Sequence, residues 1–89
     1  MVRMFIRHSV RNYAKWRRAY NGFDRERRRM GVKGHAVYRN CARPNEISVT
    51  HDFASLTRAR SFASSRRLRE VMKGAGVRGA PTIWFTKRA

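Results

Sequence analysis

The chain has 89 residues and carries 22 Lys and Arg against 5 Asp and Glu, which gives a formal net charge of +17. An apolar fraction of 42% excludes a disordered tail, and no apolar run is long enough to span a membrane. The single cysteine, Cys41, excludes an internal disulfide and favours a reducing, cytoplasmic location. We therefore expect one domain over residues 1–89 that contacts no membrane and gains burial by pairing with a second copy.

The first third of the chain predicts a strand followed by a helix. Residues 2–8 read as a strand with two different faces, one with Met4, Ile6 and His8 and the other with Arg3, Phe5 and Arg7. Asn12 is a suitable N-cap for the helix, and Gly31 is a suitable residue to end it. Large apolar residues then recur at helical spacing, namely Tyr13, Trp16, Tyr20, Phe23 and Met30. This region therefore predicts an amphipathic helix with an aromatic stripe.

The middle of the chain predicts a β-hairpin. Two runs rich in β-forming residues, 34–39 and 46–53, are separated by a short segment of turn formers. Opposite charges favour a register in which Arg39 faces Glu46. The same register sets Gly34 beside His51.

The last third predicts a second helix and a final strand. Ser55 can cap the helix, and the serine pair 64–65 interrupts it before the helical period resumes. Glycines and a proline then precede an apolar strand over 82–87.

This β-α-β-β-α-β order predicts an α+β fold of the ferredoxin-like kind, with a four-stranded antiparallel sheet and the helices on one face. The first and third strands are then central neighbours, with Ile6 opposite Val49 and Arg3 opposite Asp52. The face under the helices, here called the covered face, is predicted to hold Met4, Ile6, His8, Ala36, Tyr38, Ile47, Val49, His51 and Phe53. The other face, here called the open face, is predicted to hold Arg3, Phe5, Arg7, His35, Val37, Arg39, Glu46, Ser48, Thr50 and Asp52.

The predicted open face mixes apolar and charged residues, and such a face needs a partner. Two sheets packed face to face would form a closed barrel with the helices outside, which is a dimeric α+β barrel. We therefore expect a homodimer. Its interface is predicted to include Arg3, Phe5, Arg7, Val37, Arg39 and Asp52.

The covered face also predicts a pocket for a small molecule. The small residues Gly34 and Ala36 lie opposite Trp16 and Tyr20 in this register, which leaves an apolar space beside His51. His51, and more distantly His8, are the candidate catalytic groups, with His51 kept neutral by burial so that it can accept a proton. The predicted substrate-binding residues are Trp16, Tyr20, Gly34, Tyr38 and Trp84. Both histidines and these aromatics can instead be ordinary core residues.

No other chemistry is indicated by the spacing of the residues. Cys41 has no histidine, cysteine or acid at metal-ligand spacing, and no phosphate loop or nucleophile elbow is present. We therefore expect no metal and no cofactor, and a planar phenolic or acidic molecule as ligand.

The sequence also resembles a family of small bacterial proteins in the dimeric α+β barrel superfamily, often called cyclase-like or grouped near the antibiotic-biosynthesis monooxygenases. The segments that carry the resemblance are Phe5-Ile6-Arg7-His8, Asn12-Tyr13-Ala14-Lys15-Trp16, Gly31-Val32-Lys33-Gly34-His35-Ala36-Val37-Tyr38-Arg39, Pro44-Asn45-Glu46, His51-Asp52-Phe53, Phe62-Ala63-Ser64-Ser65, Gly76-Val77 and Pro81-Thr82-Ile83-Trp84-Phe85. Characterised relatives in this superfamily oxidise or rearrange polycyclic phenols without metal or flavin. The resemblance implies aromatic roles for Trp16, Tyr20 and Tyr38. No Asn or Arg of this sequence can be matched to a site residue of those relatives.

Two other function classes stay open at this point. RNA-recognition domains share the same element order, and residues 4–7 and 33–38 are similar to their two ribonucleoprotein motifs, with Phe5 and His35 predicted on the open face. The second motif, however, lies on the second strand instead of the third. The high positive charge predicts non-specific contact with nucleic acid in any case. The third class is a dimer that binds a small ligand without catalysis.

Overall fold

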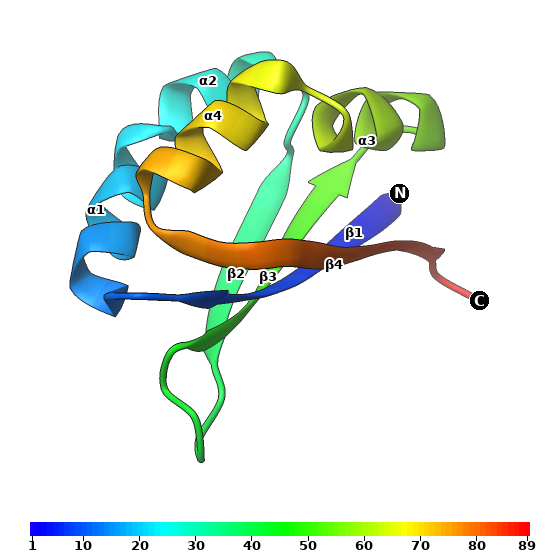
Figure 1. The fold of residues 1–89 in the computed structure, drawn as a ribbon. Helices are drawn as coiled ribbons and strands as arrows, with labels where there is room; N and C mark the ends of the chain where they lie inside the picture. Colours follow the sequence, from blue (N-terminus) through cyan, green and yellow to red (C-terminus); the bar gives the residue numbers. More distant parts are fainter.

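The computed structural model describes all of residues 1–89, and its elements follow the predicted order. The elements are β1 (Val2–Val10), α1 (Tyr13–Gly22), α2 (Asp24–Arg29), β2 (Gly34–Arg39), β3 (Glu46–Phe53), α3 (Leu56–Ala63), α4 (Arg66–Gly74) and β4 (Val77–Lys87). The strands form one antiparallel sheet in the order β2-β3-β1-β4. All four helices lie over one face of the sheet, and the other face is uncovered (Figure 1). The predicted ferredoxin-like α+β fold is confirmed.

Short polar residues start three of the four helices, two of them, Asn12 and Ser55, as predicted. The Asn12 side chain accepts a hydrogen bond of 2.9 Å from the Lys15 amide, and Ser55 and Ser65 cap α3 and α4 in the same way. Gly31 follows the last helical turn of α2 with a φ of 101°, which is the left-handed conformation that favours glycine at this position.

The region predicted as one long helix is two helices. Phe23 lies between α1 and α2 with φ −88° and ψ 0°, and its amide bonds back to the preceding turn. Gly22, a weak helix former, precedes the break. Phe23 remains buried in the core between the two helices.

The central pair of strands has the predicted register. Ile6 pairs with Val49, and Arg3 pairs with Asp52. Arg3 Nε donates to Asp52 Oδ1 at 2.7 Å, so the charge pair that favoured this register is formed. The covered-face positions of β1 and β3 are therefore those predicted, with His8 and His51 under the helices.

The predicted register of the hairpin is wrong by one residue. Arg39 pairs with Ile47 instead of Glu46, and His51 pairs with His35 instead of Gly34. Because side chains alternate along a strand, a slip of one residue exchanges the two faces of β2. His35, Val37 and Arg39 therefore lie on the covered face. Gly34, Ala36 and Tyr38 lie on the open face.

The turn and the core explain this register. Asn40 closes the loop: its amide donates to the Glu46 carbonyl at 2.9 Å, and its side chain accepts from two amides of the turn. Val37 then packs against the core, and the Arg39 guanidinium lies 3.8 Å from the centre of the Tyr13 ring. These contacts outweigh an exposed pair between Arg39 and Glu46, which is worth little in water.

The last strand is longer than predicted and begins at Val77. Its pairing with β1 is irregular between Arg7 and Ser9, opposite Gly79, which has a φ of 69°. Trp84 pairs with Phe5, so it lies on the open face, where the two rings stack at 5.1 Å. The prediction that Trp84 lines the pocket is wrong.

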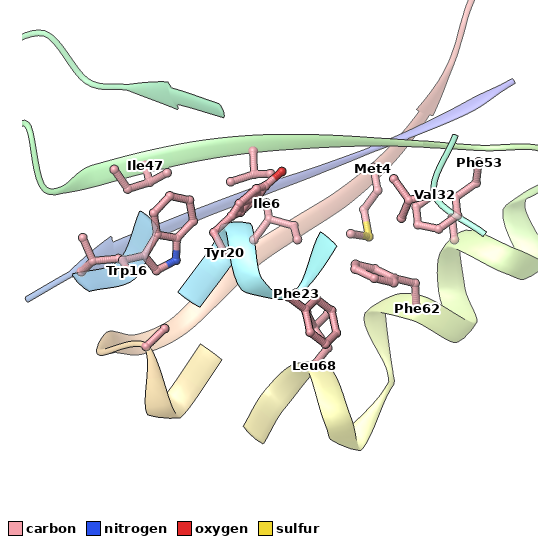
Figure 2. Packing of buried hydrophobic residues seen from close by; sticks show 14 residues of the cluster. Met4, Ile6, Trp16, Tyr20, Phe23, Val32, Ile47, Phe53, Phe62 and Leu68 are labelled. Carbon is pink, nitrogen blue, oxygen red and sulfur yellow. The ribbon is translucent and has the colours of Figure 1, made fainter. Parts of the chain in front are cut away.

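The core lies between the sheet and the helix layer, where aromatic and aliphatic side chains from both layers meet (Figure 2). Met4, Ile47, Phe53 and Phe62 are fully buried there. No helix is long and apolar enough to cross a membrane.

Candidate functional site

A small cavity of about 50 Å³ lies inside the covered face, between the sheet and the helices. Its walls are mainly apolar, and they come from both central strands and from all four helices. The lining residues are Ile6, His8, Trp16, Tyr20, Phe23, Arg27, Val49, His51, Phe62, Leu68, Val71, Met72 and Ala75. This volume is that of one or two water molecules, since liquid water occupies roughly 30 Å³ per molecule.

The two candidate catalytic histidines both line this cavity. His8 comes from β1 and is 7% exposed, and His51 comes from β3 and is 4% exposed. The Nδ1 atom of each ring is buried and has no hydrogen-bond partner. Such atoms are rare in folded proteins, and each one calls for an explanation.

Burial keeps both histidines neutral near pH 7. It lowers the pKa of His51 from 6.5 to about 3, with a further contribution from the Arg27 charge. Burial also lowers the pKa of His8. A neutral imidazole offers one donor and one acceptor nitrogen, so both rings can bind a hydroxyl or a carboxylic acid.

Arg27 is a buried cation in the wall of the cavity that was not predicted from the sequence. Its side chain is 3% exposed, and burial lowers its pKa. Arg27 Nη2 donates to the Tyr20 carbonyl at 2.6 Å, and Nη1 donates to Asp24 at 3.1 Å, while Nε has no partner. The signal was its spacing: Trp16, Tyr20 and Arg27 continue one helical stripe at intervals of four and seven residues.

Trp16 and Tyr20 form an aromatic wall of the cavity. Their rings stack with centroids 5.0 Å apart, and Trp16 meets His8 edge-on at 5.5 Å. The Arg27 guanidinium lies 3.8 Å from the centre of the Tyr20 ring. The aromatic wall therefore carries a fixed positive charge on one side.

The predicted pocket beside Gly34 does not exist. Gly34 lies on the open face, where an added Cβ would meet Asp52 Oδ2 at 3.3 Å. Phe62 occupies the covered side instead and contacts His51 with ring centroids 5.0 Å apart. Tyr38 is 58% exposed on the open face. Neither Gly34 nor Tyr38 lines the cavity, and both are wrong as pocket residues.

His35 was predicted on the open face, but it lies beside the aromatic wall. The Tyr20 hydroxyl bonds to His35 Nδ1 at 2.5 Å, and His35 Nε2 is 3.4 Å from Asp24 Oδ1. The His35 ring also stacks on His51 at 6.3 Å. The sequence placed these residues apart because the hairpin register was off by one residue. With His35 on the covered face, the open face also lacks one of the two rings that an RNA platform needs.

The open face holds a different set of contacts. Arg3 and Asp52 are paired there, and Phe5 stacks on Trp84. Of the predicted interface residues, Arg3, Phe5, Arg7 and Asp52 lie on this face. Val37 and Arg39 do not, because they point to the helix side of β2.

Comparison with solved structures identifies the fold. A Bordetella bronchiseptica protein, provisionally named an antibiotic biosynthesis monooxygenase, matches with a TM-score of 0.84 and 16% identity over 99% of this chain and 96% of that one. SnoaB, a cofactor-independent oxygenase from Streptomyces nogalater, matches with a TM-score of 0.79 and 12% identity over 99% and 92%. The chain has the antibiotic-biosynthesis-monooxygenase fold. A Nitrosomonas europaea protein with the same provisional name matches at 0.73 and 10% identity over 99% and 98%.

The resemblance found in the sequence is thus confirmed for the fold. No protein-family model and no curated protein sequence matches the chain. The sequence identities to these structures are far below 25%, so the similarity establishes the fold only. The reaction has to be argued from the site itself.

Proposed function

We propose that the cavity binds a small phenolic or acidic molecule and that the protein is a cofactor-independent enzyme of the monooxygenase or cyclase kind. One observation carries this proposal. The three buried side-chain nitrogens without partners belong to His8, Arg27 and His51, and all three residues line the same cavity. An unpartnered buried polar atom costs about 1–3 kcal/mol, so such a cluster is expected where a ligand supplies the missing partners.

The chemistry of these groups defines the ligand. Arg27 Nε can only donate, and it therefore needs an acceptor such as a carboxylate, phenolate or enolate oxygen. Neutral imidazoles add an acceptor for a hydroxyl proton and a donor for an oxygen. The stacked Trp16 and Tyr20 rings favour a planar, apolar body. A phenol or an aromatic acid combines these features.

A phenol or an aromatic acid is larger than the cavity of about 50 Å³, so the outer wall must move to admit it. The wall on that side comes from α4, through Leu68, Val71 and Met72. Val71 and Met72 are partly exposed, and a methionine side chain changes conformation easily. We therefore expect α4 to shift outward when the cavity is filled.

Thermal unfolding with 4-hydroxybenzoate tests this function. At ten times its dissociation constant a ligand stabilises the folded state by roughly 1.4 kcal/mol, which raises the melting temperature of a chain this small by several degrees. We expect this rise in the wild type and in Tyr38→Ala, whose side chain lies outside the cavity, but not in His51→Ala. Sodium chloride at equal ionic strength controls for screening of the surface charge. If His51→Ala fails to fold, His51→Gln replaces it. An equal rise in all variants would contradict the site.

We also propose that the protein is a homodimer joined through the open face. Phe5 and Trp84 form an apolar stack there, and Trp84 is 41% exposed in the single chain. A second copy would cover these rings and would exclude water from the pair between Arg3 and Asp52. Sedimentation at micromolar concentration tests the proposal: a dimer is expected, and a monomer would contradict it.

A further inference from the structure

We propose that Tyr20, His35 and Asp24 form a proton relay that connects the cavity to solvent. This inference rests on the proposed function, because it assigns the path by which the bound molecule loses or gains a proton. The three residues come from α1, β2 and α2 and meet at one end of the aromatic wall. His8 and His51, which line the same cavity as Tyr20, are not members of the relay.

One hydrogen bond and one ion-pair contact set the direction of the relay. Asp24 can only accept while it is ionised, so the proton of neutral His35 lies on Nε2, which is 3.4 Å from Asp24 Oδ1. His35 Nδ1 is then free to accept, and it takes the hydrogen bond of the Tyr20 hydroxyl. The same ordered arrangement of hydroxyl, imidazole and carboxylate activates nucleophiles and bases in other proteins.

The inner end of the relay is buried, and the outer end is wet. Tyr20 is 7% exposed and lines the cavity, with its hydroxyl turned toward the sheet (Figure 2). The side chains of His35 and Asp24 are 35% and 33% exposed. A proton can therefore leave at Asp24 without opening the core.

The surrounding charges hold the relay in place. Asp24 accepts from Arg27 at 3.1 Å, and its other oxygen pairs with Arg28 at 2.9 Å. Burial, with Arg27, Arg17 and Arg28 nearby, lowers the pKa of His35, and the Asp24 charge opposes that shift. Arg27 also opposes the rise that burial causes in the pKa of Tyr20. The groups facing His35 are thus Arg17 and Tyr20 on α1, Asp24, Arg27 and Arg28 on α2, and His51 on β3.

The transfer is balanced at each atom. The hydroxyl of the bound molecule gives its proton to Tyr20 Oη while the Tyr20 proton moves to His35 Nδ1. The imidazolium then releases its Nε2 proton to solvent beside Asp24, and the bound molecule stays as an anion near Arg27. The reverse sequence returns a proton to the product. No bond other than an O–H or N–H bond forms or breaks.

Nuclear magnetic resonance of the histidine nitrogens tests the Tyr20–His35 hydrogen bond and the position of the His35 proton in the free protein. We expect His35 to carry its proton on Nε2, and we expect its Nδ1 signal to shift in Tyr20→Phe. A proton on Nδ1 would overturn the relay, because Tyr20 would then be the acceptor.

The rate of proton exchange tests the relay in action, with 4-nitrophenol as the probe because its absorbance reports ionisation. After a pH jump, we expect the bound probe to ionise about tenfold or more slowly in Asp24→Asn and His35→Gln than in the wild type. Glu26→Gln is the matched control. It also removes a carboxylate from α2, but that carboxylate pairs with Arg67 and not with His35. Equal rates in Asp24→Asn and Glu26→Gln would overturn the relay and leave the binding site intact. Failure of the probe to bind would overturn both the site and the relay.

Discussion

The two sides of the sheet differ in whether their polar side chains have partners. On the open face the charged groups of Arg3 and Asp52 meet in a two-point ion pair, and the large rings stack on each other. On the covered face His8 and His51, and above it Arg27 of α2, each keep a buried nitrogen without a partner. A face whose polar groups are satisfied suits assembly, whereas a face that holds unsatisfied groups around a cavity suits chemistry. This difference is the basis for placing the candidate site under the helices.

The largest expected difference concerns core packing. Phe62→Ala should lower the free energy of unfolding by about 3–5 kcal/mol, because Phe62 is 1% exposed and fills the space beside His51. Trp84→Ala on the open face should lower the free energy of unfolding of the single chain by less, since that ring is 41% exposed. Urea unfolding of both variants measures the comparison, and equal losses would contradict it.

The next effect is a loss of stability in acid. The pKa of His51 is about 3 in the folded chain and 6.5 when it is unperturbed, so the unfolded chain binds its proton first. Stability is therefore complete above about pH 6.5 and falls toward pH 3, by roughly 1.4 kcal/mol per pH unit from this residue. The lowered pKa values of His8 and His35 act in the same direction. His51→Gln should flatten the dependence, and a wild type whose stability is constant from pH 7 to pH 4 would contradict the burial argument.

A change on the open face should alter assembly more than folding. Phe5→Asp places a charge in the stack with Trp84, so we expect monomers that keep the fold. Sedimentation measures the mass, and circular dichroism confirms the fold. Tyr20→Phe, a change on α1 in the wall of the cavity, serves as the control that should stay dimeric. Dissociation of both variants would mean that the two faces are not independent.

The smallest effect is expected for the exposed ion pair. Asp52→Asn removes the charge that faces Arg3, and the stability of the single chain should change little, because exposed pairs are screened by water. The effect should shrink further as salt is added. A large loss in the monomer would show that the open face also stabilises the fold.

The sequence could predict the centre of the sheet because two independent signals agreed there. For β1 and β3, the apolar match of Ile6 with Val49 and the charge match of Arg3 with Asp52 require the same register. The edge strand β2 has one neighbour only, and the charge match of Arg39 with Glu46 was weaker than the turn chemistry of Asn40. Because the predicted register was wrong by one residue, every side chain of β2 was assigned to the wrong face of the sheet.

The candidate site was predictable in part for the same reason. His8, His51, Trp16 and Tyr20 were found because they lie on regular strands and on a helical stripe. Arg27 was missed because an arginine in so basic a sequence is expected in solvent, although its position continues that stripe. His35 was predicted on the open face because the hairpin register was wrong. The relay depends on the observed register, which places His35 beside Tyr20.

The two tryptophans provide the most direct test of the account, because they lie on opposite sides of the sheet. Trp16 lines the cavity under the helices, and Trp84 lies on the open face. The indole N–H signals of 15N-labelled protein can be followed while 4-hydroxybenzoate is added. We predict that the Trp16 signal shifts and saturates while the Trp84 signal stays constant. A shift of Trp84 alone, or of neither signal, would contradict the claim that the covered face holds the functional site.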